Sequence, residues 1–129
     1  MLSRSLLAML ILVALAASLN AWGANDLKWG HPQVPRAGAC FYKEKGFAGD
    51  YFCISSGHSY NVLPDGINDR ISSIRVFGGA SVQIYNDSNF GGRNMQFRED
   101  VANLKKVALP SDPSKNWDDR ISSIAVQSH

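Results

Sequence analysis

The chain has 129 residues, with 13 Lys plus Arg against 11 Asp plus Glu. Since Arg4 lies in the N-terminal segment, twelve basic residues face eleven acidic ones beyond residue 24. Such a balance argues against a nucleic-acid partner, which requires a basic stripe. The roughly 105 residues that follow residue 24 suffice for one domain with a modest core and exclude a second independent one.

The first 24 residues have the pattern of a secretory signal peptide. Arg4 is followed by an apolar run from Leu6 to Ala17 and then by small residues. The run is shorter than the roughly 20 residues that a membrane-spanning helix needs. We therefore expect a secreted or periplasmic mature chain without a membrane span, which begins between residues 17 and 25.

Residues 25–37 contain two prolines and no hydrophobic period. This composition predicts an irregular lead-in rather than a strand or a helix. The folded domain is expected to follow it, over residues 38–129.

The rest of the chain contains two copies of one pattern. The first pattern starts with an aromatic residue, has Phe five positions later and Gly two positions after the Phe. It occurs over residues 42–49 and again 43 positions later, over 85–92. The pentapeptide Asp-Arg-Ile-Ser-Ser occurs at 69–73 and 50 positions later, at 119–123. The second copy thus has about seven extra residues, in or near 108–117. Two units are too few for a solenoid or a propeller and indicate a paired structure with an internal pseudo-twofold.

Both copies alternate apolar and polar residues with the period of a β-strand. Val82 and Ile84 show this before the glycines, and Met95 and Phe97 after them. The nearest approach to a helix, residues 101–109, is ended by Pro110. We therefore predict an all-β sandwich of two four-stranded Greek keys, over about 38–79 and 80–128.

The two cysteines occupy equivalent outward positions in the first copy. A shift of 43 aligns Cys40 with Gln83 and Cys53 with Gln96, each beside a core-facing position. Cysteines on neighbouring strands of an exported protein are expected to form a disulfide. A metal role is disfavoured, because no third or fourth soft ligand lies near in the sequence.

These paired signatures, in this order and twice, resemble the βγ-crystallin superfamily, and most closely its exported microbial single-domain members. The resemblance extends over about residues 38–128. The chain is also similar to a short branch of that superfamily with a hairpin disulfide, which is grouped with secreted inhibitors of metalloproteinases. The resemblance implies the Greek-key sandwich.

The resemblance also implies two Ca²⁺ ions. A hard cation of this kind takes six to eight oxygen ligands, which the Asn, Asp and Ser residues of 68–73 and 118–123 can supply. In the family, each ion takes side chains of the acid or amide pair, the third residue's carbonyl, the fifth residue's hydroxyl and a carbonyl from the partner repeat's hairpin. The implied ligands are Asn68, Asp69, the Arg70 carbonyl and Ser72 for one set, Asp118, Asp119, the Arg120 carbonyl and Ser122 for the other, and the hairpin carbonyls of Glu44 and Asp87.

Local structure is the competing interpretation of the same residues. Asp and Ser at the entrance to a strand also form Asx and Ser/Thr turns. We assign Ser73 and Ser123 to hydrogen bonding of the folded hairpins, and Gly49 and Gly92 to positive φ or close backbone approach. The aromatic residues expected to hold each hairpin over its sheet are Tyr42, Phe47, Tyr85 and Phe90.

Three classes of function remain open. The three histidines show no metalloprotease spacing and no nucleophile motif is present, so we expect no enzyme. The first class is a calcium-binding module, and the second an inhibitor whose partner is an exported metalloproteinase. The third is a carbohydrate or cell-envelope binding module, supported only by aromatic residues expected at the surface, such as Trp29 and Trp117.

Overall fold

A computed structural model describes residues 27–129, so the expected signal peptide lies outside the described residues. Over 27–129, no helix has the length and apolar character needed to cross a membrane.

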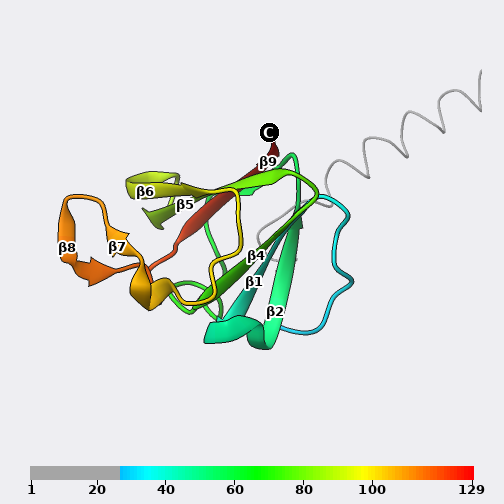
Figure 1. Cartoon of the computed structure of the whole chain (residues 1–129), viewed down its shortest axis with the longest axis horizontal. Helices are drawn as coiled ribbons and strands as arrows, with labels where there is room; N and C mark the ends of the chain where they lie inside the picture. Colours follow the sequence, from blue (N-terminus) through cyan, green and yellow to red (C-terminus); the bar gives the residue numbers. More distant parts are fainter. Residues whose placement is uncertain (1–26) are drawn as a thin grey trace, which may run out of the picture.

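The described chain is built from β-strands and short 3₁₀ turns, which confirms the all-β prediction (Figure 1). The elements are β1 (Gly38–Glu44), η2 (Lys45–Phe47), β2 (Ala48–Ser55), β3 (His58–Tyr60), β4 (Ser73–Phe77), β5 (Ala80–Asp87), β6 (Gly91–Phe97), η3 (Leu104–Lys106), β7 (Ala108–Leu109), β8 (Asp112–Asn116) and β9 (Ser123–Ser128).

The two repeats exchange a strand. One sheet has the order β2-β1-β4 and the other β3-β9-β5-β6, all antiparallel, so that β3 of the first repeat completes the sheet of the second. The reciprocal strand of the second repeat is reduced to a single bridge between Val101 and Ile74. This reciprocal strand is short because η3 begins soon after Val101. Asn103 caps η3, and its side-chain oxygen accepts a hydrogen bond from the Lys105 N–H.

The core lies between the two sheets. Alternate residues of the longer strands β1, β2, β5, β6 and β9 contribute to the core, as the period predicts. Trp29 of the lead-in packs edge-on against Phe52 with ring centroids 5.4 Å apart. The lead-in is irregular but docked, because Leu27 is buried and Gly30 bridges Tyr51 on β2. The largest fully buried side chains are those of Trp117, Phe41, Phe52, Ile54, Ile67, Ile71, Ile74, Ile84, Leu104, Ile121, Ile124 and Val82.

The extra residues of the second repeat form the hairpin of β7 and β8, at the edge of the molecule (Figure 1). Leu109, which pairs with Asp112 beside the turn, is buried, and the Trp117 N–H after β8 donates to the Val107 carbonyl at 3.1 Å. Trp117 is 0% exposed, so the expectation that it is a surface aromatic was wrong. The carbohydrate-binding interpretation thereby loses one of its two supports.

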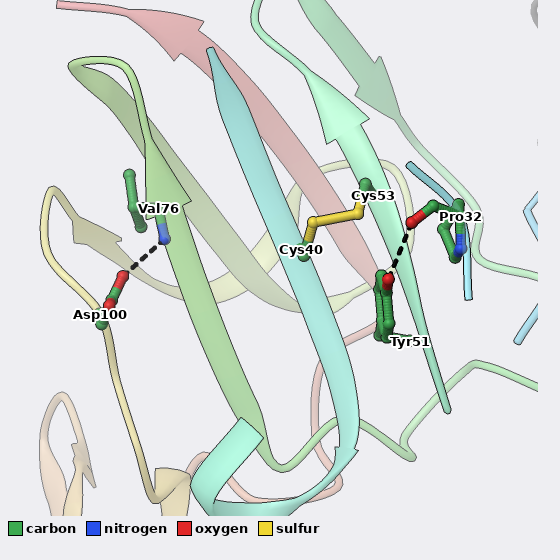
Figure 2. The surroundings of a disulfide bond; sticks show 6 residues. All are labelled: Pro32, Cys40, Tyr51, Cys53, Val76 and Asp100. Carbon is green, nitrogen blue, oxygen red and sulfur yellow. Dashed lines mark hydrogen bonds between the residues drawn. A yellow bond between two sulfur atoms is a disulfide. The ribbon is translucent and has the colours of Figure 1, made fainter. Parts of the chain in front are cut away.

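The disulfide between Cys40 and Cys53 is present, as predicted (Figure 2). The two residues are directly opposite on β1 and β2, with Cα atoms 4.0 Å apart. Gln83 and Gln96 face each other in the same way on β5 and β6. The alignment of the two repeats therefore holds residue by residue at this position.

Removal of the disulfide by Cys40→Ala/Cys53→Ala should lower the free energy of unfolding by about 3 kcal/mol, because the bond restricts a loop with a separation of 13 residues in the unfolded chain. Urea denaturation of oxidised protein and double variant measures the difference. The matched control is Cys40→Gln/Cys53→Gln, which installs the pair found in the second repeat. Equal stability of wild type and both variants would contradict the expectation.

Candidate functional site

The two repeated pentapeptides lie against each other. The Asp69 N–H donates to the Ile121 carbonyl at 3.1 Å, and the Asp119 N–H donates to the Ile71 carbonyl at 3.1 Å. Both aspartates have left-handed backbone, with φ of 59° and 56°. Among non-glycine residues, Asp and Asn adopt this conformation most readily. The doubled motif therefore builds a reciprocal loop pair at the pseudo-twofold.

Each loop is also fastened to the hairpin of its own repeat. The Ser73 hydroxyl donates to the Glu44 carbonyl, and the Ser123 hydroxyl to the Asp87 carbonyl, both at 2.6 Å. The same hydroxyls accept from the N–H groups of the hairpin phenylalanines at 3.1 Å. The structural role predicted for both serines is confirmed.

The hairpins themselves have the expected aromatic pairs. The rings of Tyr42 and Phe47 are 5.8 Å apart, and those of Tyr85 and Phe90 are 5.4 Å apart, both edge-on. The following glycines have positive φ, and a Cβ at Gly92 would clash with the side chains of Asn86 and Asp87. The hairpin fold thus fixes the positions of the Glu44 and Asp87 carbonyls.

Two hollows flank the loop pair. Hollow one, of about 360 Å³, and hollow two, of about 480 Å³, both include Asp118 and Asp119. The other residues of hollow one are Lys43, Glu44, Lys45, Arg70, Ser72, Asn103 and Lys105. The other residues of hollow two are Asp69, Asn86, Asp87 and Arg120.

Each hollow combines residues of both repeats. Hollow one places Ser72 with the acids of the second loop, and hollow two places Asp69 beside Asp87 of the second repeat. The Ser122 hydroxyl lines neither hollow but donates to Asp69 Oδ1 at 3.2 Å, across the repeats. Of the residues implied as ligands, Asn68 is the other that lines neither hollow.

The charges of the hollows differ. Four basic residues accompany three acidic ones in hollow one, whereas four acidic residues accompany one arginine in hollow two. Sequence reasoning missed the lysines of hollow one. Lys43 and Lys45 directly flank Glu44 and could have been noticed, but Lys105 comes from η3 and carries no motif signal.

Burial and the neighbouring Asp118 carboxylate raise the pKa of Asp119 above its ordinary value, and Lys105 and Arg70 oppose this shift. A carboxyl group in this environment is costly to ionise unless a cation neutralises it.

The oxygens at the hollows suit a hard cation. Among residues 27–129, no three His, Cys, Asp or Glu side chains gather as a metal cluster, so an ion here needs carbonyl and hydroxyl oxygens as well. The Glu44 and Asp87 carbonyls each accept one hydroxyl bond, and a carbonyl oxygen has a second lone pair. Carboxylate, carbonyl and hydroxyl oxygens together are the donor set that Ca²⁺ prefers.

The fold and the paired loops define a βγ-crystallin domain, and solved structures agree. One similar chain, from work on the evolution of the eye lens βγ-crystallin domain fold, is 24% identical over 79% of this chain and 97% of its own, with a TM-score of 0.63. A βγ-crystallin domain from Flavobacterium johnsoniae is 28% identical over 70% and 94%, with a TM-score of 0.57. A domain of Abundant Perithecial Protein from Neurospora crassa, in its Ca²⁺-bound form, is 21% identical over 74% and 93%, with a TM-score of 0.57.

The family within this fold follows from a match to the sequence model of peptidase inhibitor family I36, over residues 32–97. The chain belongs to that family. The match includes the disulfide hairpin and extends to the end of β6. No curated protein matches the chain.

Proposed function

We propose that this chain is an exported, non-enzymatic βγ-crystallin module that binds two Ca²⁺ ions, one in each hollow beside the loop pair. The observation that carries the proposal is the reciprocal bonding of Asp69 and Asp119 to the opposite loop. Support comes from the hollows beside these bonds, since hollow one is lined by Glu44 with acids of the second loop and hollow two by Asp69 with Asp87. A bound ion would therefore join the repeats and stabilise the sandwich.

The two ions should bind with unequal affinity. The Coulomb energy of Ca²⁺ favours hollow two, where acids dominate, over hollow one, where Lys43, Lys45 and Lys105 repel a cation. Isothermal titration of chelator-treated protein should show two steps, of which the tighter disappears in Asp69→Asn and the weaker in Ser72→Arg. Heats that match those of Mg²⁺ at equal ionic strength would overturn the calcium proposal.

Asp119 supplies a pH test. A carboxyl whose folded-state pKa is raised above its unfolded value stabilises the fold while protonated, and this contribution is lost as pH rises through the folded pKa. With chelator at pH 7, Asp119→Asn should thus be more stable than wild type, and the advantage should vanish on acidification below the ordinary Asp range. Asn also accepts the left-handed backbone. In millimolar Ca²⁺ the order should reverse, because the variant loses a charged ligand. Thermal melting across pH, with and without Ca²⁺, measures the stability difference between variant and wild type in each condition. A calcium-free variant less stable than wild type at pH 7 would refute the expected stabilisation.

Peptidase inhibition is the second candidate function, favoured by the family match over residues 32–97. The partner would be an exported metalloproteinase. Titration of such enzymes with the protein should give tight, stoichiometric inhibition, and the same titration in chelator-free Ca²⁺ buffer with Asp69→Asn tests whether inhibition needs the ion. Inhibition that is absent across a panel of exported metalloproteinases would exclude this candidate and leave calcium binding unaffected.

A further inference from the structure

The hairpin of β7 and β8 carries a third hollow, which shares Lys105 with hollow one but is lined by none of the acidic residues of the loop pair. Lys105 and Lys106 of η3 and Lys115 of β8 line it, together with Ser114 and Asn116, around a volume of about 260 Å³. Three ammonium groups that share one concave surface raise the local positive potential, although the whole chain is nearly neutral.

This positive charge is only partly compensated. Asp112 is the acid of the hairpin, and it already accepts from the Ser114 hydroxyl at 2.6 Å and pairs with Lys115 at 3.7 Å. Lys105 and Lys106 form no ion pair within residues 27–129. The hollow therefore retains capacity for an external anion.

The hairpin is also held rigidly. Leu109 beside the turn and Trp117 after β8 are both buried in the core, and the Arg93 Nε–H donates to the Pro110 carbonyl at 3.0 Å. Pro110 and Pro113 restrict the backbone of the turn that joins β7 and β8. A preorganised surface loses little conformational entropy on binding. The first repeat folds without such a hairpin, so the sandwich itself does not require it.

We propose that this hollow, the hairpin basic site, binds an acidic segment of a partner protein. Phosphate groups are commonly held by arginine forks or by backbone N–H groups at helix N-termini. The hollow has neither: its lysines attract a phosphate only as separate point charges, without the fork that holds a single phosphate group in place, and Pro113 has no N–H to offer. Separate ammonium groups suit carboxylates spaced along an extended chain. The Asn116 amide NH₂ can donate to a peptide carbonyl between them, since the Asn116 oxygen accepts from the Asp118 N–H.

The test uses a fluorescent hexa-aspartate peptide and the folded chain in chelator, so that the result is independent of calcium. Anisotropy should show saturable binding that weakens steeply with salt. A charge-reversed variant should bind at least tenfold more weakly, and a control with the same net charge should stay within twofold of wild type. The charge-reversed variant is Lys105→Glu/Lys106→Glu/Lys115→Glu, and the control, with exposed residues elsewhere, is Lys28→Glu/Arg36→Glu/Arg98→Glu.

A second variant, Lys106→Glu/Lys115→Glu, spares Lys105, which also lines hollow one. It should lose most of the peptide binding while the calcium titration stays as in wild type. Equal losses in the control and in the charge-reversed variant would overturn the proposal, as would the absence of peptide binding. Tighter binding of polyphosphate than of the peptide at equal charge would overturn the choice of partner class. None of these outcomes bears on the calcium proposal, which is tested separately by titration of the protein with Ca²⁺.

Discussion

Calcium at 100 times its dissociation constant is expected to raise the melting temperature by on the order of 10 °C for each ion bound. The reason is mass action. The proposed sites combine Asp69, Asp119 and hairpin carbonyls of different repeats and would exist in the folded state only, so binding should add roughly 2.7 kcal/mol to the free energy of unfolding. At weak affinities, of roughly 10⁻⁴ to 10⁻³ M, millimolar Ca²⁺ gives a smaller part of that shift.

Two variants divide the shift between the hollows. Ser72→Arg places a cation in hollow one, and Asp69→Asn removes a charge from hollow two while it keeps a residue that tolerates left-handed backbone. Ser122 is only 7% exposed, so an Arg at that position would disturb the fold as well as the ion. Asp69→Asn should abolish the larger part of the calcium-dependent shift. A wild-type melting curve that is the same in chelator and in several millimolar Ca²⁺, with Mg²⁺ as ionic-strength control, would refute the expectation.

The strands and the disulfide could be predicted because they depend on local and repeated patterns. Alternation of apolar residues assigns each strand a face, and the shift of 43 between the repeats aligns Cys40 with Gln83. Strand register preserves that alignment, since Cys40 faces Cys53 and Gln83 faces Gln96. Cross-strand pairs at the same register position in two copies of one motif have the same spacing of their side chains.

The grouping of the loop residues could not be predicted from the motifs. The resemblance implied a hairpin carbonyl from the partner repeat, but it kept each serine with the acids of its own motif. In the structure, Ser72 lines hollow one with Asp118 and Asp119, and the Ser122 hydroxyl donates to Asp69. Lys105 reaches hollow one from η3, which directly follows the single bridge at Val101. Tertiary placement of this kind leaves no periodic signal in the sequence.

The burial of Trp117 could have been inferred, and the missed signal is instructive. The shift of 50 that aligns the pentapeptides places Trp117 on Ile67, which is also buried. In each repeat the backbone carbonyl of this residue accepts a hydrogen bond from the backbone N–H of the arginine three positions later, at 3.2 Å for Trp117 and 3.1 Å for Ile67. The two positions are therefore the same turn in two repeats, and an apolar residue before the acid pair is a structural requirement of the loop.

Trp117→Ala is accordingly expected to lower the free energy of unfolding by about 3–5 kcal/mol, because it leaves a cavity at a fully buried site that also anchors the hairpin. Trp117→Phe is the matched control. Among residues 27–129 the indole Nε1 donates to no acceptor, so its loss leaves none of them unpaired, and the cost should stay below about 1.5 kcal/mol. Urea denaturation of the three proteins in chelator measures both differences. A Trp117→Ala variant within 1 kcal/mol of wild type, a margin taken as about the effect of an average substitution, would show that the loop and hairpin do not depend on this anchor.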